Sequence, residues 1–320
     1  MHGLRAGVGW DLGGTKLDGV WVDSRGRIQG SETQELPPDR SLGGLGAFLE
    51  ALDAKLVGSR LPPRVSGLSV AAVVEGPEAK ATHAPNLPAL RGRALVPWLE
   101  RRLGRRFVVV NDANAGAEVE RRLGRVTGDF LYVILGTGIG GAWVLDGRVY
   151  PGRYGSAGEI GHVYAGPPDR PCGCGLRGCL ETQAGGRGLG EIATEGLGPR
   201  RSRAGGRVDR PWTAKELLLL AEEGHPRARV LRDRAGGVLG RALASLMNAT
   251  GVERVVIDGR LLVGAPGYAR TIRKAWSEGL IAPLKGRARW TRARPFPHRM
   301  AYGAWSLAQP DAPRPAGSPG

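Results

Sequence analysis

The sequence predicts an α/β fold with two topologically similar halves. Residues 4–10 are typical of a short buried strand, and they lead into a glycine-rich turn at 11–16 and a second strand at 17–22. The same order of strand, glycine-rich turn and strand returns over residues 130–145. A length of 320 residues leaves room for one large domain or two of medium size, with an ample hydrophobic core.

The other elements follow from hydrophobic periodicity and turn residues. A third strand is expected at 27–33 after a hairpin turn at 23–26, and apolar residues at helical spacing predict a crossover helix at 42–56. In the second cycle, strands at 130–135 and 142–145 flank a turn at 136–141. Further strands are expected at 65–74, 107–110 and 255–257, and further helices at 113–123, 214–223 and 227–249.

Two segments have no clear period. Residues 185–210 are rich in Gly and Arg and are expected to form loops around a short helix. Residues 311–320 are rich in Pro, Gly and Ala and are expected to form a flexible tail.

Composition excludes several classes of protein. A hydrophobic content of 41% argues against general disorder, and no run approaches 18 consecutive apolar residues, which argues against a membrane span. The first residues enter a strand pattern without an apolar signal core or a cleavage site, so we expect a cytoplasmic protein.

The formal net charge of +16 is what a nucleic-acid-binding protein often carries. Only six of the 46 basic residues are Lys, however, and Arg, Gly and Pro are abundant together along the whole chain. This pattern indicates a general compositional bias, and we favour a solvated basic surface over a nucleic-acid interface.

The three cysteines lie within eight positions of one another and close to a histidine. The run Cys172-Gly-Cys174 is followed by Cys179, and His162 precedes it in Gly-Glu159-Ile-Gly-His162. Three thiolates and one imidazole make a complete tetrahedral set for Zn²⁺, and a closed set of this kind is structural. A disulfide framework would need more, and more widely spaced, cysteines.

The first glycine-rich turn has the residues of a phosphate-binding loop. Gly13 and Gly14 let the backbone approach a phosphate closely, Thr15 adds a hydroxyl, Lys16 adds a positive charge, and Asp11 can hold water around Mg²⁺. Two glycines alone would also fit an ordinary β-turn, and the spacing of a Walker A loop is absent.

The second glycine-rich turn, with Gly136, Thr137 and Gly138, has the same chemistry and the same place after a strand. Two such loops, one in each half, favour a nucleotide whose phosphates are held between the halves.

A pair of polar residues follows the predicted strand at 107–110. Asn111 and Asp112 stand at its carboxyl end, where open α/β sheets place their ligands. A carboxylate there can accept a proton from a hydroxyl that attacks phosphorus. An N-cap for the following helix is the simpler alternative, and beside two phosphate turns we favour the general base.

These motifs resemble the ROK family of repressors, open reading frames and sugar kinases, in particular its bacterial glucokinases. The matching segments are the two glycine-rich turns, Asn111-Asp112, Glu159-x-Gly-His162 and Cys172-x-Cys-Gly-x-x-Gly-Cys179-x-Glu181, with a fainter match to the closing helix at 303–308. The resemblance implies a two-lobed, actin-like fold with RNase H-like lobes and a cleft between them. It would place a small lobe at 1–114 plus 301–310 and a large lobe with the zinc knuckle at 115–300.

The resemblance also implies roles for individual residues. Asp112 would be the base that activates the 6-hydroxyl of a hexose, with ATP and Mg²⁺ as the phosphoryl donor. The other sugar hydroxyls would be bound by Asn86, Asn111, Glu159, His162 and Glu181. His162 would bind the structural zinc through one ring nitrogen and the sugar through the other. Many relatives are dimers, and the resemblance is compatible with a homodimer.

This sequence departs from the family pattern in two places. A Pro-Gly turn is usual in the segment that ends in Asn86, and here residues 74–78 read Val-Glu-Gly-Pro-Glu. The strand on the adenosine side usually ends in a run of glycines, and here Asp258 and Arg260 flank a single Gly259. Gly259 is expected to face the nucleotide, Arg260 would stack on the adenine or block it, and Asp258 would add a negative charge near the phosphates.

Three functions fit these observations. An ATP-dependent kinase that phosphorylates a hexose at its 6-hydroxyl is favoured, with glucose first and N-acetylmannosamine or another hexose as the alternative. A non-catalytic sugar-binding regulatory protein would explain the altered segment around Arg260. A repressor would need a helix-turn-helix domain, and only ten residues precede Asp11.

Overall fold

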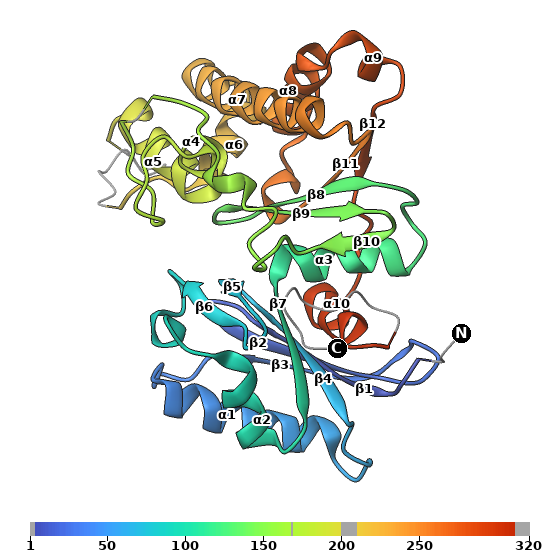
Figure 1. Cartoon of the computed structure of the whole chain (residues 1–320). Helices are drawn as coiled ribbons and strands as arrows, with labels where there is room; N and C mark the ends of the chain where they lie inside the picture. Colours follow the sequence, from blue (N-terminus) through green and yellow to red (C-terminus); the bar gives the residue numbers. More distant parts are fainter. Residues whose placement is uncertain (1–3, 168, 200–209, 311–320) are drawn as a thin grey trace. The chain divides into compact units, whose positions relative to one another are not determined.

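The computed structural model describes residues 4–167, 169–199 and 210–310 (Figure 1). The flexible tail expected at 311–320 therefore lies outside the described residues. The chain divides into two compact units. The first comprises Met1–Gly128, Ala142–Gly158 and Arg294–Gly320, and the second comprises Asp129–Gly141 and Glu159–Ala293.

The first sheet has five strands in the order β3-β2-β1-β4-β7. The strands β1, β2 and β3 form an antiparallel meander, whereas β4 and β7 run parallel to β1. The parallel strands therefore end at one edge of the sheet. The bounds are β1 Gly7–Leu12, β2 Lys16–Val22, β3 Ile28–Glu35, β4 Val65–Val70 and β7 Arg106–Asn111.

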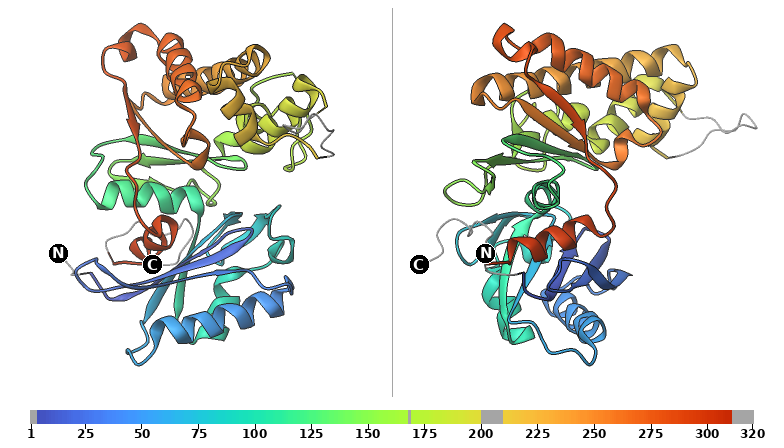
Figure 2. Two further views of the ribbon diagram at one scale, coloured as in Figure 1. Left: turned by 180° about the vertical axis from the view of Figure 1, so that it is seen from behind. Right: turned by 90° about the vertical axis from the view of Figure 1, so that its right-hand side faces the viewer.

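Helices cover both faces of this sheet (Figure 2). On one face, α1 (Leu42–Val57) and α2 (Leu95–Leu103) bury leucines against the apolar side chains of β1 and β4. On the other face, α3 (Asp112–Arg122) and α10 (Arg299–Leu307) pack with β2 around Trp305. Between β4 and α2 the chain also forms a small hairpin of β5 (Val73–Glu75) and β6 (Lys80–His83) and the short helix η1 (Pro88–Leu90).

Helix α10 lies directly on the backbone of the sheet. A Cβ atom added at Gly9 would fall 1.9 Å from the carbonyl oxygen of Ala301, and one added at Gly67 would fall 2.0 Å from that of Ala304. Both glycines are therefore required by close packing. The buried ion pair of Arg299 with Glu120 (2.6 Å) further ties α10 to α3.

The second sheet repeats this plan with the order β10-β9-β8-β11-β12. The strand β11 runs parallel to both β8 and β12, and β10 is antiparallel to β9. The bounds are β8 Phe130–Leu135, β9 Ile139–Leu145, β10 Arg148–Tyr150, β11 Arg254–Asp258 and β12 Arg289–Arg292. Two sheets of the same strand order confirm the predicted pair of similar halves and its α/β, actin-like fold class.

Most helices of the second unit follow the zinc-knuckle motif in the chain. A capping box between Thr213 and Glu216 starts α6, and Gly251 in the left-handed region ends α7. The elements are η2 Ile160–His162, α4 Leu180–Ala184, α5 Gly186–Leu197, α6 Ala214–Glu222, α7 Pro226–Thr250, η3 Arg260–Leu262, α8 Pro266–Gly279 and α9 Ala282–Lys285.

The short helix expected within residues 185–210 is α5, which is three turns long, and residues 200–209 lie outside the described residues. The glycines of α5 are needed for packing, because a Cβ at Gly188 would fall 2.3 Å from the carbonyl oxygen of Thr182. The second glycine-rich turn is also shorter than predicted, since β9 already begins at Ile139.

The remaining predicted strands and helices are confirmed to within a few residues, except that the strand expected at 65–74 is divided between β4 and β5. Helices α2 and α8 were not predicted. Within the described residues, no helix is long and apolar enough to cross a bilayer.

The contact of α10 with β4 gives a test of this packing. We expect Gly67→Ala to lower the free energy of unfolding by about 2–3 kcal/mol, because the added methyl group forces the helix off the sheet. Gly43→Ala is the control, since its Cβ would meet nothing closer than 3.7 Å and should be neutral or stabilise α1 by up to about 1 kcal/mol. Urea unfolding of the three proteins measures both effects, and equal stability of all three would contradict this packing.

Candidate active site

The carboxyl edge of the first sheet gathers the polar residues of the first unit. Asp11 on β1 stands opposite Ser69 on β4, and Asn111 ends the neighbouring strand β7. The Ser69 hydroxyl donates a hydrogen bond of 2.8 Å to Oδ1 of Asp11. Ser69 was not predicted as a site residue, and its only signal in the sequence is that it is a small polar residue within a β-rich run.

Asn111 takes the N-cap role that the sequence offered for this pair of residues. Asn111 is the N-cap of α3, because its Oδ1 accepts the backbone N–H of Asn114 at 2.8 Å. Asp112 is the first residue of the helix, and its Oδ1 accepts the N–H of Ala113 at 2.8 Å. Burial raises the pKa of the Asp112 carboxyl, and that shift makes the carboxylate a better proton acceptor.

Asp11 is the second partly buried carboxyl group at this edge. Burial raises its pKa to about 7, the Ser69 hydrogen bond opposes that rise, and the negative charge of Asp112 adds to it. A divalent cation beside Asp11 would favour its charged form again. The donor set thus fits the Mg²⁺ role expected for Asp11.

The first glycine-rich turn is the hairpin between β1 and β2. The N–H of Gly13 donates to the carbonyl of Lys16 at 3.0 Å, and Arg40 donates to the carbonyl of Gly14 at 3.0 Å. Asn86, which follows β6, lies against this turn, since a Cβ at Gly14 would fall 2.8 Å from that of Asn86. Thr15 is exposed. The first unit therefore brings Asn86 to the predicted phosphate turn.

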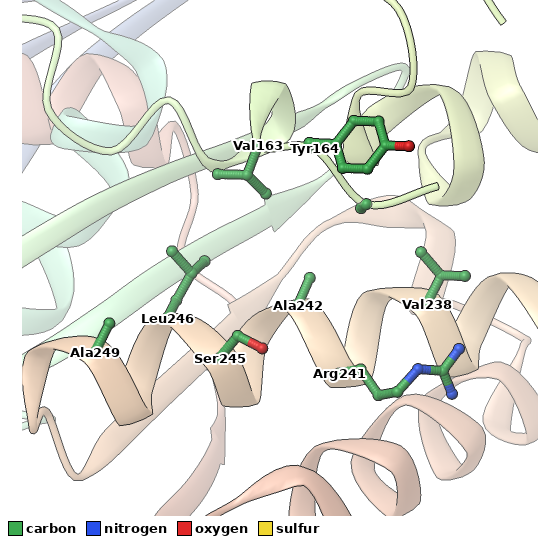
Figure 3. A pocket seen from close by; sticks show the side chains of 9 residues that line it. Val163, Tyr164, Val238, Arg241, Ala242, Ser245, Leu246 and Ala249 are labelled. Carbon is green, nitrogen blue, oxygen red and sulfur yellow. The ribbon is translucent and has the colours of Figure 1, made fainter. Parts of the chain in front are cut away.

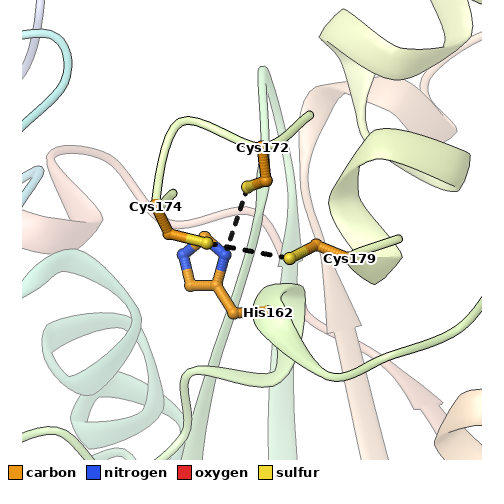
Figure 4. Close-up of side chains that lie close together, drawn as sticks. All are labelled: His162, Cys172, Cys174 and Cys179. Carbon is orange, nitrogen blue, oxygen red and sulfur yellow. Dashed lines mark hydrogen bonds between the residues drawn. The ribbon is translucent and has the colours of Figure 1, made fainter. Parts of the chain in front are cut away.

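The four predicted metal ligands form one cluster in the second unit (Figure 4). The ligand atoms of His162, Cys172, Cys174 and Cys179 all lie within 4.8 Å of one another. Sulfurs that share one zinc ion lie about 3.8 Å apart at Zn–S distances of about 2.3 Å. The Sγ atoms of Cys174 and Cys179 are 3.7 Å apart, so the residues fit the ion.

Tight backbone turns bring these ligands together. The N–H of Cys172 donates to the carbonyl of Leu176 at 2.8 Å, and Gly175 and Gly178 adopt left-handed conformations. Gly178 also has no room for a side chain, because its Cβ would fall 2.8 Å from the carbonyl of Gly166. Burial raises the pKa of the Cys172 and Cys179 thiols, and a bound Zn²⁺ would favour their thiolates.

The two nitrogens of His162 face different neighbours. Nδ1 lies 3.5 Å from Sγ of Cys172, whereas Nε2 lies 3.9 Å from Oε2 of Glu159. Nδ1 therefore lies beside Cys172 of the metal cluster and Nε2 lies on the side of Glu159, while the dual role expected for His162 stays a prediction.

Glu181 connects the metal cluster with the second glycine-rich turn. Its Oε1 lies 3.0 Å from Sγ of Cys172, and its Oε2 lies 2.4 Å from the position that a Cβ of Gly138 would take. A side chain at Gly138 would therefore displace this carboxylate. The second unit thus brings together three predicted elements: the metal ligands, Glu181 and the turn.

The start of α5 holds this turn in place. The N–H of Gly186 donates to the carbonyl of Gly136 at 3.0 Å, and the N–H of Arg187 donates to the carbonyl of Thr137 at 2.8 Å. A cavity of about 730 Å³ opens beside the turn. Its lining residues come from the turn, from α5, from the start of α6 and from η3, and they include Arg187, Trp212, Lys215 and Arg260.

Gly259 lies next to the same turn. Its φ of 116° is in a region that favours glycine, and a Cβ there would fall 2.1 Å from the carbonyl oxygen of Leu135. The carboxylate of Asp258 accepts hydrogen bonds from the Tyr132 hydroxyl (2.5 Å) and from the N–H of Gly259 (2.7 Å). Both oxygens of Asp258 therefore have partners within the fold.

A second cavity of about 340 Å³ lies between residues 163–165 and α7 (Figure 3). Apolar side chains such as Val163 and Leu246 line it together with Tyr164 and Arg241. No predicted site residue is among the described residues that line it.

Comparison with known proteins identifies the family. The model of the ROK family matches residues 7–310. A curated N-acetylmannosamine kinase of Salmonella typhimurium is 34% identical over 264 residues, which are 82% of this chain and 85% of that protein. The chain belongs to the ROK family.

Solved structures agree with this assignment. A ROK hexokinase of Thermus thermophilus has a TM-score of 0.80 at 30% identity, with 95% of this chain and 98% of that chain covered. A ROK glucokinase of Streptomyces griseus, solved with glucose and AMPPNP, has a TM-score of 0.75 at 28% identity, with 95% and 99% covered. The fold is that of the family's sugar kinases, and the chain is a ROK sugar kinase.

The metal cluster gives a direct prediction. Purified protein is expected to contain about one zinc ion per chain, and Cys174→Ser should lose the metal and lower Tm by roughly 10 °C, or about 3 kcal/mol. Leu176→Ser changes an exposed residue of the same loop and should keep the metal. Elemental analysis and thermal unfolding measure both; a fully zinc-loaded Cys174→Ser protein would contradict the ligand assignment.

The raised pKa of Asp11 predicts a pH dependence of stability. Between about pH 4 and pH 7 the folded state keeps a proton on Asp11 that the unfolded state releases, so this group makes stability fall as pH rises through that range. Asp11→Asn should remove that fall and be more stable than the native protein at pH 8 by at least about 1 kcal/mol.

Asp23→Asn is the matched control with the opposite sign. Hydrogen bonds from the Arg27 backbone and neighbouring groups lower the pKa of Asp23 to about 2, so its ionised form stabilises the fold above that pH. The variant should lose stability at pH 8. Denaturant unfolding between pH 4 and pH 8 compares the variants, and parallel pH profiles for the Asp11 variant and the native protein would contradict the prediction.

Proposed function

We propose that the chain transfers the γ-phosphoryl group of MgATP to the 6-hydroxyl of a hexose, with glucose as the first candidate substrate. The observation that carries this proposal is the partly buried Asp112 carboxyl at the start of α3, whose negative charge raises the pKa of the cation-binding candidate Asp11. In this reaction Asp112 takes the proton of the hydroxyl while its oxygen attacks the γ-phosphorus, and ADP leaves.

The other predicted residues take supporting roles in this proposal. The hydroxyls of the sugar are bound by Asn86, the amide group of Asn111, Glu159, Nε2 of His162 and Glu181. Asp11 and the 13–16 turn serve Mg²⁺ and the phosphates from the first unit, and Gly136, Thr137, Gly138 and Gly259 serve the nucleotide from the second. The predicted small lobe, 1–114 plus 301–310, contains the general base Asp112. The predicted large lobe, 115–300, contains the glycines proposed to bind the nucleotide.

N-acetylmannosamine is the second candidate substrate. The curated Salmonella relative at 34% identity is an N-acetylmannosamine kinase, whereas the solved glucokinase of Streptomyces griseus is 28% identical. Turnover of glucose, N-acetylmannosamine, N-acetylglucosamine, fructose and allose under matched conditions ranks them by kcat/KM. A preference of more than about tenfold for N-acetylmannosamine over glucose would replace glucose in the proposal.

Asp112→Asn tests the catalytic role. We expect kcat to fall by about 10²–10⁴-fold, because the proton of the sugar hydroxyl loses its acceptor, while the sugar dissociation constant changes little. In the native enzyme kcat should rise with pH through the raised pKa of Asp112, since only the carboxylate accepts a proton.

A coupled assay with calorimetric sugar binding separates the outcomes. Glu278→Gln removes an exposed carboxylate of α8 and should leave both quantities unchanged. Undiminished turnover in Asp112→Asn would refute the assignment of the base. Sugar binding without turnover of any hexose in the native chain would favour a regulatory protein instead.

A further inference from the structure

We propose that Arg260 binds the polyphosphate chain of the phosphoryl donor, together with Arg187, and is a determinant of donor affinity in this chain. The inference rests on the proposed function for the identity of the donor. It reverses the expectation that Arg260 stacks on the adenine or blocks its site.

The position of Arg260 along the cavity is fixed by the residue before it. Gly259 packs on Leu135, where its Cβ position lies 2.5 Å from the backbone nitrogen and 2.1 Å from the carbonyl oxygen. Leu135 is the last residue of β8 and directly precedes Gly136. Arg260 therefore enters the cavity at the end occupied by the glycine-rich turn.

Arg187 reaches the same end of the cavity from another element. Its backbone N–H donates to the carbonyl of Thr137, and its exposed side chain lines the cavity. Elsewhere along the lining, Trp212 is fixed by a hydrogen bond of 3.0 Å from its Nε1 to the carbonyl of Gly198. Two arginines thus flank the turn, and the indole ring offers an apolar surface to a base.

The charges of the lining are not balanced within the cavity. Its two acidic residues, Glu191 and Glu195, both face Arg170, which makes a bidentate contact with Glu195 and lies 3.7 Å from Glu191. Within the described part of the chain, no ion pair involves Arg187 or Arg260. The cavity therefore presents positive charge to its ligand at the end next to the turn.

Asp258 does not cancel this charge. Its two carboxylate oxygens accept from the Tyr132 hydroxyl and from the N–H of Gly259, so the carboxylate is held against β8. Tyr132 itself is fully buried. The hydrogen bond from Gly259 holds the Asp258–Gly259 peptide in place, and the exposed guanidinium of Arg260 is the group of this segment that meets the ligand.

Guanidinium groups suit phosphate oxygens because their planar N–H donors match pairs of oxygens. Inorganic tripolyphosphate has the phosphate chain of ATP without the base, and adenosine has the base without the phosphates. Binding of MgATP, Mg-tripolyphosphate and adenosine is measured by calorimetry on the full chain. Arg260→Ala should weaken MgATP and Mg-tripolyphosphate by about tenfold and leave adenosine unchanged.

Arg273→Ala is the matched control, because it removes one exposed positive charge of the second unit outside the cavity. It should bind all three ligands like the native chain. Arg260→Lys should recover part of the loss, since it keeps the charge without the planar fork. The salt dependence of MgATP binding should be shallower in Arg260→Ala than in Arg273→Ala.

The outcomes separate this inference from the proposed function. Equal weakening of adenosine and MgATP in Arg260→Ala would show that Arg260 binds the base, and native affinity for all three ligands would show that it binds neither part; both results overturn the inference. Sugar kinase turnover would survive either of them. Arg260-dependent binding of MgATP without turnover of any hexose would uphold the inference and overturn the proposed function.

Discussion

The electrostatics of the first unit depend on two partly buried carboxyl groups that the parallel strands bring to one edge of the sheet. Asp11 is the last residue but one of β1 and Asp112 directly follows β7, and loss of solvent makes each carboxyl group harder to ionise. Two negative charges this close together repel each other, so ionising both carboxyl groups is unfavourable without a positively charged partner. The Ser69 hydroxyl offsets part of that cost, and a divalent cation would offset more.

In the second unit, a series of contacts holds the loops in one conformation. Cys172 of the metal cluster contacts Glu181, and Glu181 in turn lies against Gly138 of the glycine-rich turn after β8. Each contact uses a glycine or a short side chain, so there is little space for adjustment. Substitutions in this chain of contacts are expected to act together, because neighbours that share packing rarely contribute independently.

The fold and the metal cluster were largely predictable, because both leave local signals in the sequence. Repeated strand and glycine patterns indicated two similar halves, and the spacing of His162 and the cysteines indicated one tetrahedral set. Only a short helix was expected where α5 lies, because its glycines lower helix propensity, and the packing of Gly188 against Thr182 could not be seen from local sequence. The partners of Asp258 depend on the register of β8 and β11, which are far apart in the chain.

Helix α10, which packs on one face of the first sheet, is built from residues that follow the second unit in the chain. Val20, Val22 and Trp305 share one buried cluster, although the whole second unit lies between Val22 and Trp305 in the sequence. During synthesis on the ribosome, the first sheet therefore keeps one apolar face exposed until α10 has emerged. Meanwhile the segments of the second unit, 129–141 and 159–293, are already complete, so this unit can finish folding before the one that begins the chain.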